Sequence, residues 1–277
     1  LAARALGPVG RFAQLSDAFT TASQAMERIR LLENVEIEKD SGIALQSYQG
    51  DLTVRDLAFQ YPGMSQPLFE SLNFEMKPGS VLVVTGANGT GKTTLVRLLA
   101  GLLDPDRGQI LADGVELRQL SPAWWRSNLT LLPQESGFLP ATIGENIMAA
   151  NPQLETEGLN YVIQESGLAE IIDKTPQGLD TPLTATAGLF SVGHRKRIAL
   201  ARALATGGKL VLFDDPVEGL DAKGCQIIYT LLLNLSRAGH TIIVFTQDPN
   251  IIKSATRILD LNIKPVPKIY NKTAEQS

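Results

Sequence analysis

The sequence predicts an α/β fold in which a parallel sheet and its helices form the core, accompanied by an antiparallel β subdomain and an inserted helical lobe. The run at 81–84 is continuously apolar, as expected for a strand buried on both faces, and glycines and a helix over about 92–102 follow it. Further apolar runs alternate with helical stretches, at 129–132, 210–213 and 241–245. This alternation indicates a parallel sheet.

The first 34 residues are predicted to form one amphipathic helix. Their apolar side chains recur at spacings of three and four, at Phe12, Leu15, Phe19, Ala22, Met26, Ile29 and Leu32. Residues 35–50 are polar and have the composition of a linker. We therefore expect the main domain to begin near residue 51.

The main domain is expected to span 51–262. The runs at 52–61 and 68–76 alternate apolar and polar residues and end at Pro-Gly pairs, which predicts antiparallel strands. Between about 135 and 190 the pattern is mostly helical and lacks buried-strand runs, so the helical lobe is placed there. Residues 263–277 contain Pro265 and Pro267 and are predicted to be a loose C-terminal tail.

Composition excludes several classes of protein. The formal net charge is -4, so there is no basic footprint for nucleic acid, and we expect no nucleic-acid partner. The single cysteine, Cys225, cannot form an intramolecular disulfide. No stretch approaches the roughly 20 apolar residues that span a bilayer. Because the sequence starts at Leu1, we expect it to be a piece of a longer protein.

A glycine-rich loop is the strongest chemical signal in the sequence. Residues 86–93 match GxxxxGK[ST] directly after a predicted buried strand and directly before a helix, as Gly86-Ala87-Asn88-Gly89-Thr90-Gly91-Lys92-Thr93, with Thr94 next. Glycines let backbone N–H groups turn around phosphate oxygens, and the helix N-terminus adds its positive end. Lys92 is expected to reach the β and γ phosphates and Thr93 to bind Mg²⁺.

An acidic residue is expected at the end of a second buried strand. Asp214 follows the apolar run at 210–213 and is predicted to hold the metal directly or through water. An apolar strand that ends in aspartate is common, so the prediction depends on the glycine loop. Together the two motifs predict a site for ATP or GTP with Mg²⁺.

At this point the order of motifs resembles the nucleotide-binding domain of ATP-binding cassette (ABC) exporters, over residues 51–262. The resemblance implies a P-loop NTPase (RecA-like) core, ATP with Mg²⁺, and a role for Tyr61 in stacking on adenine. Taken alone, a tyrosine at a strand end is more often a packing residue. The segment 132–134 is similar to the family's Q-loop, which implies that Gln134 contacts the metal and the attacking water.

The resemblance also implies partners. The four residues Ser191, Val192, Gly193 and His194 lie where the family has its LSGGQ signature, which contacts the γ-phosphate held by a second nucleotide-binding domain in a head-to-tail homodimer or heterodimer. Residues 138–147 look like the exporter segment that receives a transmembrane domain. The N-terminal helix is similar to the end of the transmembrane domain in type I secretion half-transporters. These similarities place the domain at the cytoplasmic face of a membrane, the inner membrane if the source is bacterial.

Several positions depart from the family pattern. Asp215 stands where a catalytic glutamate is usual, and Gln247 stands where a switch histidine is usual. The shorter carboxylate and the uncharged amide both predict slow hydrolysis with ATP binding retained. In the signature, Val192 replaces a glycine and His194 a glutamine, and His194 is expected to face solvent. The stretch 184–188 lacks a glutamate that exporters often have there.

Two functions follow from these observations. The first is an ATP-binding subunit of an ABC exporter that couples ATP binding and weak hydrolysis to transport, with proteins or peptides as possible cargo. The second is a catalytically impaired regulatory module that dimerises on nucleotide without useful hydrolysis. A soluble cassette protein of translation or repair is disfavoured by the N-terminal helix.

Overall fold

The computed structural model describes residues 2–33, 38, 41–183 and 190–271, which belong to two compact units, Leu1–Asp40 and Ser41–Ser277. The first unit is helix α1 (Ala2–Glu33), as the apolar spacing predicts. Among its described residues, the large apolar side chains Leu15, Phe19, Met26 and Ile29 are exposed. No helix in the described ranges combines the length and the apolar character that a membrane span requires.

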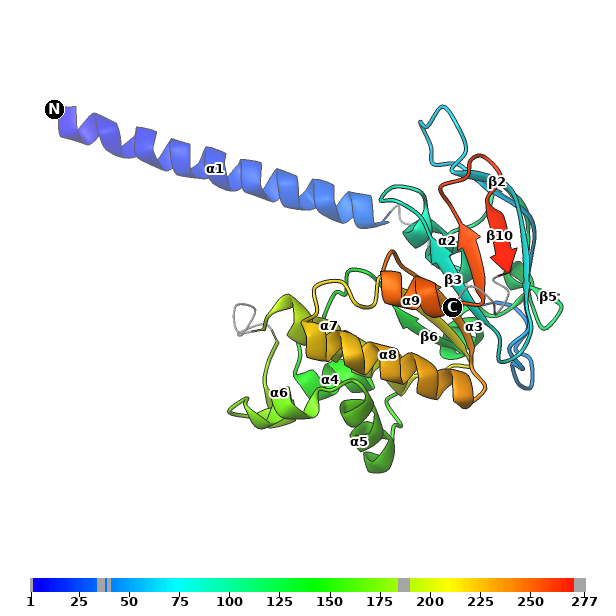
Figure 1. The fold of residues 1–277 in the computed structure, drawn as a ribbon. Coiled ribbons are helices and arrows are strands. Elements are labelled where there is room, and N and C mark those ends of the chain that lie inside the picture. The colour runs from blue at the N-terminus through cyan, green and yellow to red at the C-terminus, as the bar shows by residue number, and fades with distance from the viewer. Residues whose placement is uncertain (1, 34–37, 39–40, 184–189, 272–277) are drawn as a thin grey trace. The chain divides into compact units, whose positions relative to one another are not determined.

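The second unit contains two sheets (Figure 1). The four-stranded antiparallel sheet has the order β2-β1-β4-β5, with β1 at Leu52–Phe59, β2 at Phe69–Met76, β4 at Arg107–Ala112 and β5 at Val115–Glu116. The six-stranded sheet has the order β10-β9-β3-β8-β7-β6, with β3 at Val81–Thr85, β6 at Leu129–Leu132, β7 at Leu210–Asp214, β8 at Thr241–Phe245, β9 at Arg257–Asp260 and β10 at Lys268–Asn271. Its strands pair in parallel except β10, which is antiparallel to β9. The predicted α/β class is confirmed.

The helices follow the predicted alternation with strands. They are α2 (Lys92–Leu99), α3 (Pro122–Ser127), α4 (Ile143–Met148), α5 (Thr156–Glu165), α6 (Ala169–Asp173), α7 (Val192–Ala205), α8 (Ala222–Arg237) and α9 (Pro249–Ser254), with 3-10 turns at Leu117–Gln119 and Gly178–Asp180. In Figure 1, α4, α5 and α6 form the green helical lobe. In the sequence, the lobe lies between β6, an edge strand of the parallel sheet, and α7, in agreement with the predicted insertion.

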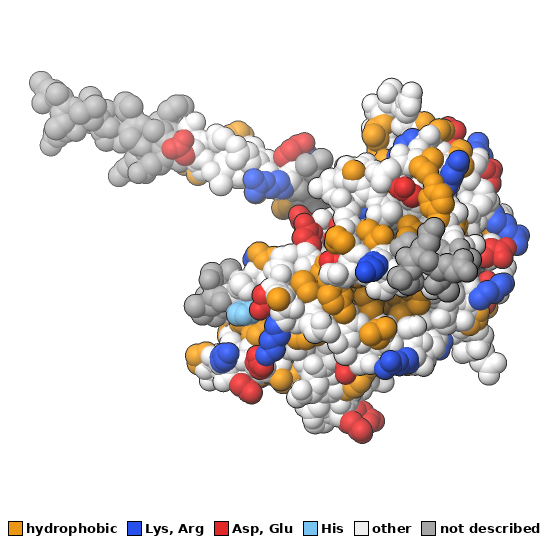
Figure 2. All heavy atoms as spheres, viewed as in Figure 1, with side chains coloured by type: hydrophobic (Ala, Val, Ile, Leu, Met, Phe, Trp, Pro, Cys, Tyr) orange, Lys and Arg blue, Asp and Glu red, His pale blue; other side chains and the backbone are white. Residues whose placement is uncertain are grey.

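The parallel sheet is buried on both faces, because successive side chains of a strand point to opposite sides. Leu82 and Val84 of β3 pack with the antiparallel sheet and α2, whereas Val83 packs with α7, α8 and the lobe. This arrangement explains why the strand is continuously apolar. On the face that carries α8 and α9, Figure 2 shows a gathering of hydrophobic side chains, where a groove of about 440 Å³ is lined by Leu232, Leu233 and Ile251 among others.

Both ends of the main domain differ from the prediction. The domain begins before residue 51, since Ile43 donates its N–H to the Gln119 carbonyl at 2.7 Å and buried Tyr48 packs edge-on against Trp125 at 5.2 Å between ring centroids. The expectation of a loose tail over 263–277 is wrong for residues 268–271, which form β10. This strand covers the edge of β9, and its short, mostly polar sequence gave no strand signal.

The start of α4 carries a complete capping box. The Thr142 hydroxyl accepts from the Glu145 N–H at 3.1 Å, and the Glu145 carboxylate accepts from the Thr142 N–H at 2.8 Å. We expect Thr142→Ala to lower the free energy of unfolding by about 1 kcal/mol, because one helix N–H loses its acceptor. Urea unfolding measures the change, with Thr230→Ala, at an exposed position of α8, as the control. Equal losses in both variants would contradict the capping role.

Candidate nucleotide-binding site

The glycine-rich loop joins β3 to α2, as predicted. Gly89 and Gly91 have φ angles of +81° and +107°, in the left-handed region that favours glycine. A Cβ at Gly91 would lie only 2.6 Å from Cδ2 of Leu68, so the loop packs directly on the start of β2. The sequence folds this way because glycine is tolerated at both positions, which leaves the N-terminus of α2 open to an anion.

Lys92 lies at the first position of α2 and is directed back into the loop. Its Nζ donates to the Gly86 carbonyl at 2.8 Å and lies 3.9 Å from Oδ2 of Asp215. Only 7% of the side chain is exposed. A buried ammonium that bonds to the loop carbonyl and faces one carboxylate is suited to donate hydrogen bonds to phosphate oxygens in the same position.

Three predicted metal ligands converge beside Lys92. The Thr93 hydroxyl donates to Oδ2 of Asp214 at 2.7 Å and lies 3.4 Å from Oε1 of Gln134. Among the described residues, Oδ1 of Asp214 is buried and has no hydrogen-bond partner. Burial raises the pKa of Asp214, because the charged carboxylate loses solvation, and a bound cation would offset that loss. A hydroxyl, an amide oxygen and an unpaired carboxylate oxygen are donors that fit Mg²⁺.

Asp215 lies at the end of β7 with a φ of +43°, and its N–H donates to the Phe245 carbonyl at 2.8 Å. Its side chain is 14% exposed. Burial raises the pKa of Asp215, the Lys92 ammonium opposes this, and the Glu218 carboxylate adds to it. The carboxylate faces the ammonium of Lys92, at 3.9 Å.

Two residues near this carboxylate were missed from the sequence. Glu218 accepts from Nε2 of Gln134 at 2.9 Å, and the buried Lys196 donates to the Gln134 main-chain carbonyl at 3.3 Å. Burial lowers the pKa of Lys196. Lys196 lies four residues before the buried Leu200, a helical spacing that could have indicated that Lys196 faces inward. Nothing local distinguishes Glu218 from a solvated loop residue.

Gln247, the residue at the predicted switch position, contacts the glycine loop itself. Its Nε2 donates to Oδ1 of Asn88 at 3.0 Å. The residue follows β8 and precedes α9, whose cap Asp248 also accepts from the Tyr229 hydroxyl at 3.1 Å. The amide of Gln247 therefore lies beside the glycine loop.

Tyr61 forms one wall of the cavity above the loop. Its hydroxyl lies 3.1 Å from Oγ1 of Thr94, and its ring packs edge-on against Phe59 at 4.9 Å. The cavity measures about 410 Å³, and its lining joins the tyrosine to the loop and the metal-side residues: Tyr61, Met64, Leu68, Asn88, Gly89, Gly91, Lys92, Thr93, Thr94, Gln134 and Asp215. Residues far apart in the sequence therefore meet in one concave site.

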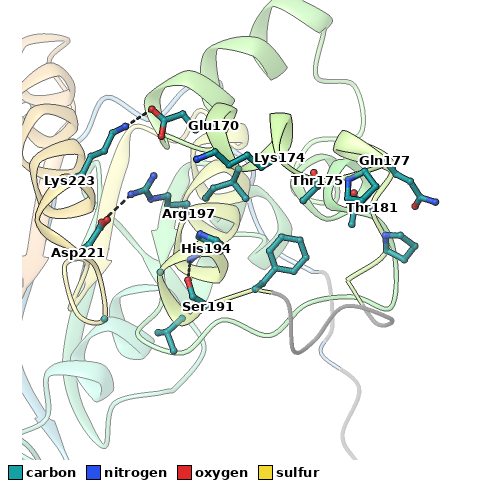
Figure 3. A pocket seen from close by; sticks show the side chains of 17 residues that line it. Glu170, Lys174, Thr175, Gln177, Thr181, Ser191, His194, Arg197, Asp221 and Lys223 are labelled. Atoms are coloured by element: carbon teal, nitrogen blue, oxygen red, sulfur yellow. Dashed lines mark hydrogen bonds and ion pairs between the residues drawn. The ribbon is translucent and has the colours of Figure 1, made fainter.

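The four signature residues lie outside this cavity, at the start of α7, where they line a separate hollow of about 1070 Å³ (Figure 3). The Ser191 hydroxyl caps the helix by accepting from the His194 N–H at 3.2 Å, and Val192 is 58% exposed.

The expectation that His194 faces solvent is wrong for its Nδ1 atom. Among the described residues, this atom is buried, and the His194 ring lies beside the ring of Phe190. The glutamate-free stretch 184–188 lies outside the described residues.

Comparisons with known proteins agree with these features. The family model described as ABC transporter matches residues 69–218, more than half of the 277 residues. The alpha-hemolysin translocation ATP-binding protein HlyB of Escherichia coli is 30% identical over 260 residues, which cover 94% of this chain and 37% of that protein. The leukotoxin translocation ATP-binding protein LktB of Mannheimia haemolytica is 29% identical with the same coverage.

A solved structure is also similar. A bacterial Atm1-family ABC exporter with ATP bound superposes with a TM-score of 0.74 and 25% sequence identity, over 86% of this chain and 42% of that one. The chain thus spans well under half of the length of these relatives. With the family match, the glycine loop and the fold in agreement, the chain belongs to the ABC transporter family, whose ATP-binding domains are ATPases.

Proposed function

We propose that this domain binds Mg-ATP in the cavity above the glycine loop and hydrolyses it slowly, as the nucleotide-binding part of an exporter. The observation that carries the proposal is the convergence of Lys92, Thr93, Gln134 and Asp214 on one point, with an unpaired Asp214 oxygen among the described residues. Mg²⁺ supplies charge neutralisation at the β and γ phosphates when bound. Tyr61 stacks on the adenine, and the loop amides of residues 86–94 hold the phosphates.

We further propose that the domain works in a pair. Ser191, Val192, Gly193 and His194 line a separate hollow and not the cavity above the glycine loop, so they are not placed to contact the nucleotide of their own subunit. They are suited to the γ-phosphate held by a second nucleotide-binding domain, because the helix start offers a hydroxyl and N–H donors. Exposed Val192 is expected to weaken this contact. The second domain is a copy of this chain or a related one with fuller motifs.

The partner on the membrane side is proposed to be a transmembrane domain of the same transporter. The Arg202 guanidinium lies over the ring of Phe138, 5.3 Å from its centre. The next residue, Leu139, is exposed and offers an apolar surface that a transmembrane domain can contact. The relatives named translocation ATP-binding proteins favour protein or peptide cargo of the type I secretion kind. In such a transporter the domain lies at the cytoplasmic face of the membrane.

A second candidate function is a regulatory module that dimerises on ATP without useful hydrolysis. The specific observations that favour it are the short carboxylate of Asp215 and the neutral Gln247, which already bonds to Asn88 in the loop. Measuring affinity and single-turnover hydrolysis on the same sample separates the two candidates. Binding without measurable turnover would support the regulatory module.

The role of Tyr61 gives a direct test of the proposed nucleotide pose. We expect Tyr61→Ala to weaken Mg-ATP binding about 10-fold, because stacking of a base on an aromatic ring contributes roughly 1–3 kcal/mol. Binding of Mg-tripolyphosphate, which has no base, should change little. Calorimetry measures both ligands.

The matched control is Tyr61→Phe. It keeps the ring and removes only the hydroxyl contact to Thr94, so its loss of ATP affinity should be smaller than that of Tyr61→Ala. Equal losses in the two variants, or an equal loss of Mg-tripolyphosphate binding in Tyr61→Ala, would count against adenine stacking. Absence of any Mg-ATP binding by the folded wild-type protein would refute the proposed function as a whole.

A further inference from the structure

The segment that follows β9 crosses the back of the glycine-rich loop, and we call residues 261–265 the C-terminal strap. The Leu261 N–H donates to the Thr85 carbonyl at 2.8 Å. Oδ1 of Asn262 accepts from the Ala87 N–H at 2.9 Å. These two bonds hold the chain on both sides of Gly86, where the loop begins.

The Asn262 side chain is itself oriented. Its backbone N–H and its Nδ2 both donate to Oδ1 of Asp260, at 2.8 Å and 2.9 Å, so that its oxygen is directed at the loop. A bond to an oriented partner costs less side-chain entropy than one to a mobile side chain. Asn262 is therefore built to fix the loop backbone.

Lys264 ties the loop to the other sheet. Its Nζ donates to the Thr90 carbonyl at 2.8 Å and also to the Leu68 carbonyl, and it lies 5.7 Å from the centre of the Phe69 ring. At the end of the strap, the Pro265 carbonyl accepts a hydrogen bond from the Glu70 N–H at 2.8 Å. One ammonium thus joins the phosphate loop to the start of β2, the strand that follows the Tyr61 turn.

The packing leaves little freedom between these parts. A Cβ at Gly86 would lie 3.1 Å from Cβ of Leu261, and a Cβ at Gly91 would lie 2.6 Å from Leu68. Leu68 also lines the nucleotide cavity beside Tyr61. The strap, the loop and the adenine wall are therefore in direct contact, and Lys264 is a polar link between the loop and the adenine wall.

We propose that Asn262 and Lys264 are positioning residues for the nucleotide: Asn262 fixes the phosphate loop, and Lys264 fixes the separation between the phosphate loop and the wall on which adenine stacks. Neither side chain touches the nucleotide. The inference rests on the proposed ATP site. The phosphate loop and the adenine wall are two half-sites for one ligand. When their separation matches that of the triphosphate and the base, ATP binds more tightly than triphosphate or base alone, and Lys264 maintains that separation.

The test compares Mg-ATP with Mg-tripolyphosphate, by calorimetry, in Asn262→Ala and Lys264→Met. Of the two half-sites, Asn262 bonds to the phosphate loop and not to the adenine wall, so its loss should weaken both ligands by the same factor, about 5-fold, as for one hydrogen bond. Lys264 also reaches the adenine wall, so its loss should weaken Mg-ATP about 10-fold and Mg-tripolyphosphate no more than about 3-fold. Methionine keeps the length of the stem and removes the charge.

Lys268→Met, four residues further along in β10, is the control for loss of one positive charge and should leave both affinities unchanged. Equal weakening of the two ligands in Lys264→Met would mean that its charge acts through space, and unchanged binding would mean that the link is dispensable; either result overturns the role of Lys264. Unchanged binding in Asn262→Ala overturns that of Asn262. Failure of the wild-type protein to bind Mg-ATP would instead refute the proposed function.

Folding is followed by thermal melting of every variant, and Lys264→Gln replaces Lys264→Met if the latter melts early. Amide hydrogen exchange gives a second readout in the nucleotide-free protein. The Ala87 N–H should exchange faster in Asn262→Ala and at the wild-type rate in Lys268→Met, because only the former loses its acceptor. Unchanged exchange at Ala87 would also overturn the role of Asn262.

Discussion

Replacing Lys92 with methionine is expected to weaken Mg-ATP binding by about 100-fold or more. The ammonium is 7% exposed, bonds to the Gly86 carbonyl and faces Asp215 at 3.9 Å. Removing one partner of a buried charged pair costs roughly 2–5 kcal/mol, and 2.7 kcal/mol corresponds to about 100-fold in affinity. Calorimetry at millimolar magnesium measures the change.

The variant has a second expected effect that helps to identify the cause. Burial raises the pKa values of Asp214 and Asp215, and the Lys92 ammonium lowers them. Without Lys92 both pKa values should rise further, so both carboxyls become harder to ionise. Thermal melting separates this effect on the fold from the effect on binding. Lys268→Met serves again as the charge control; a Lys92→Met protein that is folded and binds Mg-ATP normally would contradict the proposed phosphate site.

How much of this site was predictable depends on the range of the contacts. The glycine loop, Lys92 and Thr93 lie within eight consecutive residues, where the order strand, loop and helix dictates their geometry. Asp214 was predictable because the carboxyl ends of the parallel strands lie at one edge of the sheet, and β7 is separated from β3 only by β8. The continuous apolar run of β3 likewise follows from its burial on both faces.

The contacts that were missed join segments with no local signal. Asn262 and Lys264 lie in a segment predicted to be the domain's end and its loose tail, yet they bond to residues 87, 90 and 68. Asparagine and lysine are common at protein surfaces, so their residue types gave no sign of these contacts. The antiparallel strands β4 and β5 were missed for a related reason. Strand β4 pairs with the distant strand β1, where Leu52 lies opposite Ala112, and β5 is a short strand that pairs with β4 alone. Such pairing is fixed by the tertiary fold.

The double change Asp215→Glu with Gln247→His is expected to raise steady-state ATP hydrolysis about 100-fold. Asp215 lies at the strand end where its carboxylate faces Lys92, and one added methylene would carry the carboxylate further toward the attacking water. A displacement on the order of 1 Å at a reacting centre changes rates by about 100-fold, and a positioned general base contributes roughly 10²–10⁴-fold. Histidine at 247 adds a group that carries positive charge near pH 7, which glutamine cannot do. Phosphate release measures the rate.

The two single variants and a triple variant complete the design. If Asp215 is the main defect, Asp215→Glu alone should account for most of the gain, whereas Gln247→His alone should also lose the bond from Gln247 to Asn88 and gain less. Adding Lys92→Met to the double variant should abolish the gain, because the same phosphate site is required. A wild-type protein that already hydrolyses ATP as fast as the double variant would contradict the impaired-site proposal and leave Asp215 as a competent base. A double variant that binds Mg-ATP but stays slow would move the defect to the helix start at Val192, where a side chain stands exposed at the surface proposed to receive the second γ-phosphate.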